Sequence, residues 1–145
     1  MSSSDPRAAF AEMTKALIID FRAHDGVVTS GPFTGRPVLL LTTTGAKSGQ
    51  PRLAPLVHNR DGDHYIVAAS KGGAPTHPGW YFNLIANPAV TVEVGGETFT
   101  ARAIVPEGVE RDRLWAAHVA ANPNFADYQQ RTTRIIPVVV LERIG

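Results

Sequence analysis

The pattern of apolar and polar positions near the start of the chain predicts an amphipathic helix over residues 6–23. Asp5 is a favourable N-cap residue, and Pro6 suits the first helical position. Apolar residues then recur at helical spacing on one face: Phe10, Met13, Leu17, Ile18 and Phe21. Such a face most often packs on a core, but it also suits a helix that covers a substrate site or contacts a membrane surface.

The next part of the chain has the pattern of β-strands. Residues 37–44 form a continuous run of Val, Leu and Thr, as expected of a strand buried on both faces. Further strands are predicted over residues 52–59, 64–70, 90–94, 98–105 and 135–141, with turn signals at Asp61-Gly62 and Gly95-Gly96. Because Pro137 cannot donate a ladder hydrogen bond, we expect it at a sheet edge or a bulge.

Three later segments have helical composition, namely residues 80–86, 107–121 and 124–130. Residues 26–36 and 71–79 are rich in turn-forming residues and are expected to be irregular. About six strands joined mainly by hairpins, with helices between them and no parallel βαβ repeat, indicate an α+β fold built on a small antiparallel barrel. We expect one domain over residues 1–145, with an N-terminal helix over about 1–25 and the barrel over 37–142.

Composition narrows the classes of function. The 145 residues contain no cysteine, which excludes disulfides, thiolate metal sites and thiol nucleophiles. Fourteen basic and 13 acidic side chains give a net charge of +1, too balanced for a protein that binds bulk nucleic acid. No apolar run approaches the roughly 20 residues of a membrane-spanning helix, and the polar start is unlike a signal peptide. We therefore expect a cytoplasmic protein.

The turn after the first predicted strand carries the most informative chemistry. Lys47, Ser48 and Arg52 place two cations and a hydroxyl beside a glycine-bounded backbone, a combination that holds phosphate groups. The turn is not a P-loop, because Ala46 separates Gly45 from Lys47. Solvated charges on an ordinary hairpin are the alternative interpretation.

A second informative stretch begins at Lys71-Gly72-Gly73 and continues to Trp80-Tyr81. The glycines let backbone approach a ligand closely, and the two aromatic rings offer flat apolar faces with polar tips. Together with the cationic turn, this stretch suggests a ligand that combines an aromatic ring system with a phosphate.

These segments resemble the deazaflavin-dependent nitroreductases, within the wider group of flavin and deazaflavin oxidoreductases with a split β-barrel. The resemblance extends over residues 37–141. It is carried by LLTTTGAKSGQPR ending at Arg52, AASKGG ending at Gly73, PGWYFNL ending at Leu84, ADYQ ending at Gln129, and RIIPV starting at Arg134. The resemblance implies an FMN-binding-like split barrel and the coenzyme F420, an 8-hydroxy-5-deazaflavin with a phosphate-bearing tail.

The resemblance also implies where the coenzyme lies. The residues implied to bind the tail phosphate are Ala46, Lys47, Ser48 and Arg52. Those implied to form the adjoining wall are Leu53, Ala54, Pro55 and Leu56. The ring lies along Ala68, Ala69, Ser70 and Lys71, while Gly79, Trp80, Tyr81, Phe82 and Asn83 close its other side or touch the tail. For Trp80, an ordinary core position is the alternative.

The implied reaction is hydride transfer from the deazaflavin C5 to an electron-deficient small molecule, so the protein mainly aligns donor and acceptor. A hydroxyl near the ring would supply the proton, and Ser70 and Tyr128 are the candidate catalytic residues. The substrate-lining candidates are Val57, Asn122, Phe125 and Tyr128. Nitro-reducing relatives carry more tyrosines in this region, so this chain favours quinones, enones or other hydrophobic acceptors over nitroaromatics.

Several alternatives remain open at this stage. The chain could bind or sequester F420 without turnover, or hold FMN or haem in the same barrel. It could be a monomer or a homodimer, and its N-terminal helix could be a lid or a peripheral contact at the inner membrane face. Among the histidines, His77 lies nearest the predicted site, where a loop hydrogen bond is favoured over catalysis. The other four are expected at surface or half-buried positions: His24, His58, His64 and His118.

Overall fold

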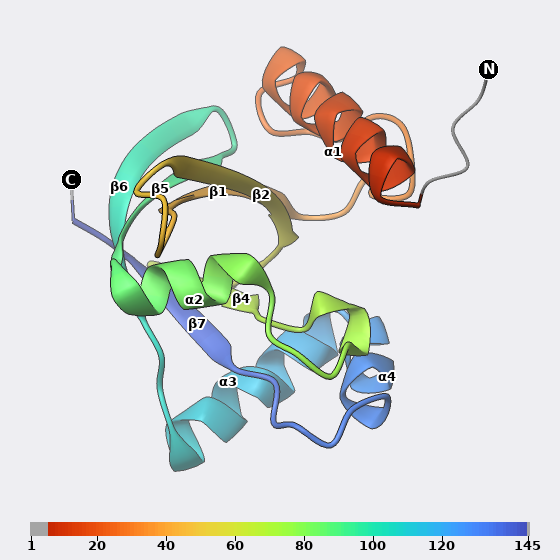
Figure 1. Ribbon diagram of the computed structural model, residues 1–145. Helices are drawn as coiled ribbons and strands as arrows, with labels where there is room; N and C mark the ends of the chain where they lie inside the picture. The colour runs from red at the N-terminus through yellow and green to blue at the C-terminus, as the bar shows by residue number, and fades with distance from the viewer. Residues whose placement is uncertain (1–5, 145) are drawn as a thin grey trace.

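The computed structural model describes residues 6–144, and its first element is the predicted N-terminal helix. Helix α1 spans Pro6–Ala23, as the sequence pattern indicated, whereas the proposed cap at Asp5 lies outside the described residues. The later helices are α2 (Gly79–Ala86), α3 (Gly108–Ala121) and α4 (Asn124–Gln130), and Figure 1 shows α1 on one side of the sheet, well separated from α3 and α4. No helix in the described part of the chain has the length and apolar character needed to cross a membrane.

The described strands form one antiparallel sheet in the order β2-β1-β5-β6-β7-β4-β3. Their bounds are Val38–Thr44 for β1, Pro51–Val57 for β2, Asn59–Asp61 for β3, His64–Ala68 for β4, Ala89–Val94 for β5, Glu97–Ile104 for β6 and Val138–Arg143 for β7. The α+β split-barrel expectation is confirmed, with seven strands in place of about six.

The additional strand results from a break at His58. The sequence pattern predicted one strand over residues 52–59, but β2 pairs with β1 while β3 pairs with β4, at the opposite edge of the sheet. Only His58 separates these two edge strands, and its N–H donates to the carbonyl of Pro37, one position beyond the last β1–β2 pair. The sheet must curl to bring its edges within one residue of each other, and this curling forms the barrel.

The final strand begins later than the pattern predicted. β7 lies centrally, between β6 and β4, where proline would interrupt a ladder. Pro137 instead precedes the strand, and its carbonyl accepts a hydrogen bond from the N–H of Ala69. The proline is therefore neither on a sheet edge nor within the paired residues.

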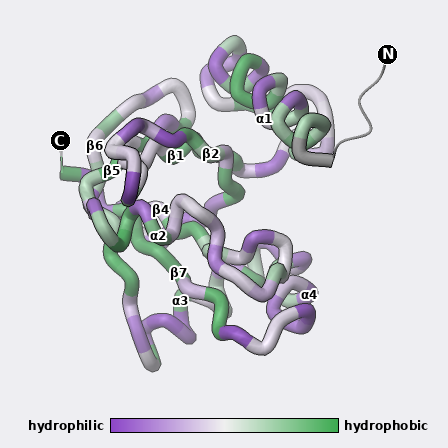
Figure 2. The backbone as a smooth tube through the Cα atoms, viewed as in Figure 1, coloured by the Kyte–Doolittle hydropathy of each residue, from purple (hydrophilic) through white to green (hydrophobic). Residues whose placement is uncertain are grey.

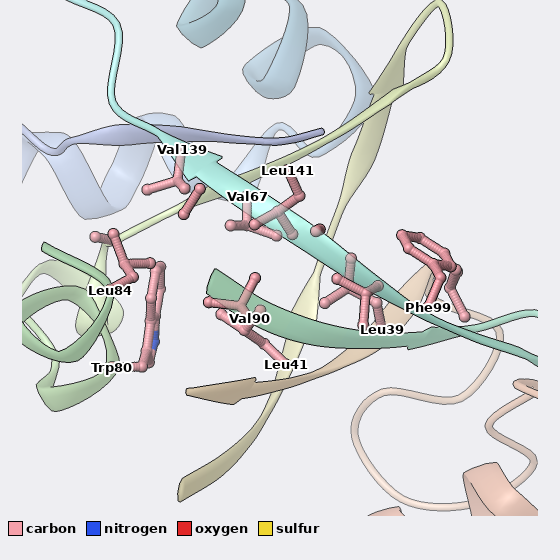
Figure 3. Packing of buried hydrophobic residues seen from close by; sticks show 14 residues of the cluster. Leu39, Leu41, Val67, Trp80, Leu84, Val90, Phe99, Val139 and Leu141 are labelled. Atoms are coloured by element: carbon pink, nitrogen blue, oxygen red, sulfur yellow. The ribbon is translucent and has the colours of Figure 1, made fainter. Parts of the chain in front are cut away.

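Side chains of the strands pack on both faces of the curled sheet. Leu39, Leu41, Val139 and Leu141 point into the barrel, where Trp80 of α2 also packs (Figure 3). The alternate residues face outward and are covered by helices, Leu40 in a cluster with α1 residues and Val138 in a cluster with α3 residues. Figure 2 shows the resulting apolar stretches along the strands. Helical cover on the outer face explains why β1 and β7 are buried on both faces, whereas β6 alternates between buried and exposed residues.

The helices after α1 match the predicted positions closely. α2 spans Gly79–Ala86, α3 spans Gly108–Ala121 and α4 spans Asn124–Gln130. A short 3-10 turn, η1, occupies Lys71–Gly73 in the stretch expected to be irregular. Gly73 has a φ of +84°, and an added Cβ there would lie 2.7 Å from the Tyr128 carbonyl oxygen. Only glycine lets η1 pack this closely against α4.

Candidate functional site

A cavity of about 430 Å³ lies where α1, β2, η1, α2 and α4 meet, and we call it the main cavity. Its walls are largely apolar and include Leu53–Val57 along β2, Phe125 of α4 and Leu17 of α1. Polar groups enter from Arg36, Ser70, Lys71, Asn124 and Tyr128. An apolar cavity with a few convergent polar groups is the usual form of a small-molecule site.

A second, shallower cavity of about 350 Å³ adjoins the main cavity, because both are lined by Leu53, Ala54, Gly79 and Trp80. Arg52 and Asn83 complete its lining. Together the two cavities form a path from the apolar interior of the site toward the β1–β2 turn. Trp80 is 9% exposed, so it serves both as a core residue and as part of the cavity wall.

The structure brings most of the predicted coenzyme-binding residues to these cavities. Leu53, Ala54, Pro55, Leu56, Ala68, Ser70, Lys71, Gly79 and Trp80 line the main cavity, and Arg52 and Asn83 line the second. Ala46, Lys47 and Ser48 lie on the turn that precedes β2. These three turn residues line neither cavity. The same is true of three more predicted residues: Ala69 is fully buried, Tyr81 is half-buried, and Phe82 is 52% exposed.

The β1–β2 turn is fastened to α2 by one side chain. The backbone N–H of Ala46 donates to Asn83 Oδ1 at 2.9 Å, and Asn83 Nδ2 donates to Thr43 Oγ1 at 3.1 Å. Within the described residues, the side chains of Lys47 and Arg52 are exposed and have neither hydrogen bonds nor ion pairs. The turn is therefore held in place while its two cations remain available to an anion.

The loop over residues 69–77 is organised by Arg134, one of the residues in the sequence motifs. Its guanidinium donates to the carbonyl oxygens of Ala69, Ser70 and Ala74 and to His77 Nδ1, at distances of 2.7–3.1 Å. Burial, followed by the nearby Arg134 charge, lowers the pKa of His77. The predicted loop hydrogen bond of His77 is thus confirmed, and the ring lines neither cavity.

Helix α4 contributes the wall opposite α1. Phe125 and Tyr128 line the main cavity, as does Val57 of β2. Asn122, also predicted to face the substrate, is only 3% exposed and lies outside the cavity wall. Asn124 takes that place, because the backbone leaves the helical conformation at Asn122 (φ −136°, ψ 80°) between α3 and α4.

Sequence patterns did not single out several lining residues as part of the site. They are Phe10, Met13, Thr14, Leu17, Phe33, Arg36, Pro78 and Asn124. The apolar stripe of α1 was visible, and part of it faces the cavity. Phe33 and Arg36 lie in the irregular segment before β1, where no periodicity marks which side chains turn inward.

Two histidines are buried, contrary to the expectation of surface or half-buried positions. His118 is fully buried and His58 is 8% exposed, and both have a pKa of about 4, with burial as the main cause. His118 Nδ1 lies 2.7 Å from Asn59 Oδ1, a contact that links α3 to β3. The expectation was wrong because the 107–121 pattern could not show which face of the helix meets the sheet.

One protein family and several known proteins are similar to this chain. The family model described as F420H(2)-dependent quinone reductase matches residues 15–143. The F420H(2)-dependent quinone reductase of Mycobacterium tuberculosis (strain H37Rv) is 48% identical over 132 residues, which cover 84% of this chain and 89% of that protein.

Two solved structures are also similar. One, described as an F420-H2 dependent reductase, is 47% identical, covers 74% of this chain and 95% of its own, and has a TM-score of 0.68. Another, described as a domain-swapped dimer, is 40% identical, covers 95% and 100%, and has a TM-score of 0.70. The chain therefore belongs to the F420H2-dependent quinone reductase family, oxidoreductases whose reductant is the reduced form of coenzyme F420.

Proposed function

We propose that this protein reduces a quinone, or another electron-deficient small molecule such as an enone or nitroaromatic, with a hydride from F420H2. The observation that carries the proposal is the main cavity, whose apolar walls lead through the second cavity to Arg52 and the adjoining Lys47 turn. These two cations have no ion-pair partner among the described residues. The cavity suits flat, uncharged molecules. The cations suit the phosphate of a coenzyme tail.

The residues present fit the coenzyme in charge and in shape. Lys47 and Arg52, with the Ser48 hydroxyl, would hold the tail phosphate through charge-assisted hydrogen bonds. The wall from Leu53 to Leu56 and the Ser70–Lys71 segment would lie along the ring system, beside Trp80. When bound, F420H2 supplies a hydride from C5. The protein contributes by placing that donor next to the acceptor and excluding water.

Reduction of a quinone to a hydroquinone also consumes a proton. Ser70 and Tyr128 both line the main cavity, and their hydroxyls are the polar groups best suited to give a proton to the reduced oxygen. Within the described residues, the Ser70 hydroxyl makes no hydrogen bond, whereas the Ser70 carbonyl accepts one from Arg134. Lys71 adds a positive charge at the same edge, which would stabilise negative charge on the acceptor.

The proposal is tested by mixing the purified protein with F420H2 and a panel of a naphthoquinone, a cyclic enone and a nitroimidazole. We expect coenzyme oxidation with the quinone and slower oxidation with the nitroimidazole. Tight F420 binding without oxidation by any acceptor would instead select a sequestering role. A parallel titration with FMN and haem separates the deazaflavin from the other ligands of such barrels.

We further propose that the protein forms a homodimer, an assembly supported by the similar domain-swapped dimer. Light scattering on the purified protein tests this, and a monomeric mass across the accessible concentration range would reject it.

A cytoplasmic location with contact at the inner membrane face is also part of the proposal. The support is the exposure of Ile19 (61%), which lies on the face of α1 opposite Phe10 and the main cavity. Co-sedimentation with anionic lipid vesicles tests the membrane contact, and the variant Ile19→Ser should reduce it.

A further inference from the structure

Three polar residues from distant parts of the chain meet at the wall of the main cavity. Arg36 Nη2 donates to Asn124 Oδ1 at 3.1 Å, and Asn124 Nδ2 donates to the Tyr128 hydroxyl oxygen at 3.0 Å. All three residues are half-buried and line the main cavity. None of their contacts is needed to build α4, because its backbone forms the helix without them.

The direction of each hydrogen bond in this chain follows from chemistry. A guanidinium has only donors, so the amide oxygen of Asn124 must face Arg36. The amide nitrogen, which has only donors, therefore faces Tyr128. The Tyr128 oxygen then accepts from Asn124, and its own proton is not used in that contact.

The position of the Tyr128 ring is fixed as well. Its ring packs edge to face against Phe125, with the centroids 5.1 Å apart, and Phe125 is 6% exposed. The guanidinium of Arg131 lies 5.7 Å from the centroid of the same ring. With the ring held and the oxygen lone pair engaged by Asn124, the remaining freedom is rotation of the O–H bond, and the free acceptor positions lie in the cavity.

We propose that Asn124, oriented by Arg36, is a positioning residue that makes the Tyr128 hydroxyl a proton donor to the acceptor molecule. This inference rests on the proposed reductase function and assigns roles to Arg36 and Asn124. When the quinone accepts the hydride, the two electrons that the hydride brings leave a negative charge on a quinone oxygen. The Tyr128 O–H bond then breaks, and its proton forms a new O–H bond with that oxygen. Solvent then returns a proton to Tyr128. The Asn124 N–H stabilises the negative charge that develops on the tyrosine oxygen.

Two substitutions of Asn124 distinguish its effect on the direction of the Tyr128 hydrogen bond from a purely structural role of its side chain. Asn124→Asp keeps the pairing with Arg36 but replaces the amide donor by an acceptor, so the Tyr128 hydroxyl turns toward residue 124 and away from the cavity. Asn124→Leu removes the amide without offering any acceptor, so the hydroxyl stays free to donate to the substrate. We expect Asn124→Asp to lower kcat by at least about tenfold, as for loss of a general acid, and Asn124→Leu to lower it less.

Tyr128→Phe should match Asn124→Asp, and the double variant should be no slower than either single variant. Affinity for oxidised F420 should remain within about twofold in all of them, because the tail contacts are elsewhere. Tyr65→Phe and Asn87→Asp are matched controls outside both cavities, and both should keep the activity of the unmodified protein. Circular dichroism and the thermal unfolding midpoint show whether each variant is folded.

A second measurement does not depend on turnover. Calorimetric titration of a naphthoquinone into the complex with oxidised F420 should show several-fold weaker binding for Asn124→Asp than for Asn124→Leu. If none of the acceptors in the panel lets the unmodified protein oxidise F420H2, the proposed function fails. If it is active but Asn124→Leu is as slow as Asn124→Asp, or slower, Asn124 only supports the structure and the inference is overturned.

Discussion

At the residue scale, the β1–β2 turn concentrates positive charge next to the second cavity. Lys47 and Arg52 are exposed, and no carboxylate in the described part of the chain pairs with them. Most other arginines are committed to internal contacts, such as Arg22 with Glu93 and Arg113 with Asp61. The unpaired cations are therefore the residues from which an incoming anion gains most.

Substitution of these cations should weaken coenzyme binding. We expect Lys47→Ala and Arg52→Ala each to lose about 1–3 kcal/mol of binding free energy, the usual contribution of a hydrogen bond to a charged group. Fluorescence titration with F420 measures the loss, which should shrink as salt is added. Lys15→Ala removes the same charge from exposed α1 surface and serves as the control. Unchanged affinity in both turn variants would mean that the phosphate binds elsewhere.

The site could be predicted from the sequence where a residue type and its neighbours specify a chemistry. The turn with Lys47 and the glycine stretch after Lys71 are of this kind. Lys71 and Gly72 line the main cavity, and the turn leads into Arg52, which lines the second cavity. Asn122 and Asn124 show the limit of such reasoning. They are the same residue type two positions apart, and the non-helical backbone of Asn122, between α3 and α4, decides which one faces the cavity.

At the scale of elements, the helices and most strands follow from periodicity, because each buries one apolar face. α1 and α4 begin and end where the pattern indicated. The break between β2 and β3 did not show in the sequence, since residues 52–59 contain no turn signal such as Asn-Gly or Asp-Gly. What divides them is the identity of their partners, which are β1 and β4.

The loop over residues 69–77 depends on Arg134, and this dependence can be measured. We expect Arg134→Gln to lower the free energy of unfolding by about 1.5–3 kcal/mol, because carbonyls of three residues lose a charged donor. Arg134→Lys should restore only part of it, since an ammonium group lacks the planar fork. Urea unfolding gives the free energies, and hydrogen exchange reports on the loop.

Arg131→Gln is the matched control for this prediction. Arg131 is exposed, and its contact with the Gly72 carbonyl is longer, at 3.5 Å. An equal loss of stability in this variant would show that Arg134 has no special role in the loop.

At the scale of the whole molecule, α3 is joined to the barrel through buried imidazoles. His118 of α3 contacts Asn59 of β3, and its ring packs edge to face on Phe125. His58 lies at the break between the two sheet edges, with its Nδ1 buried and without a partner in the described residues. Two buried, uncharged imidazoles therefore lie at the contact between α3 and the sheet and at the closure of the barrel.

Stability should therefore depend on pH in a defined window. Burial, with added repulsion from Arg60 for His58 and from His58 and Arg36 for His118, lowers each pKa from 6.5 to about 4. Below pH 6.5 the unfolded chain binds more protons than the folded protein, so stability is complete above that pH and falls between pH 6.5 and 4. The loss approaches about 3 kcal/mol for each histidine.

Denaturant unfolding between pH 7.5 and about 4.5 measures this dependence. His118→Leu should flatten the curve whatever it does to stability at neutral pH, because one titrating group is removed. His64→Leu, at an exposed site, is the control. A slope unchanged by His118→Leu would show that this histidine does not titrate differently on folding.

The sequence by itself determined the local properties of this protein: the helices, most of the strands, the cationic turn and the family to which the chain belongs. These depend on residues close together in the chain, whose periodicity and chemistry are visible in order. Only the tertiary structure decided that the sheet closes at His58, that Arg36 meets Asn124, and that two histidines lie buried. These outcomes depend on contacts between distant segments, because side-chain direction is fixed only when elements pack together.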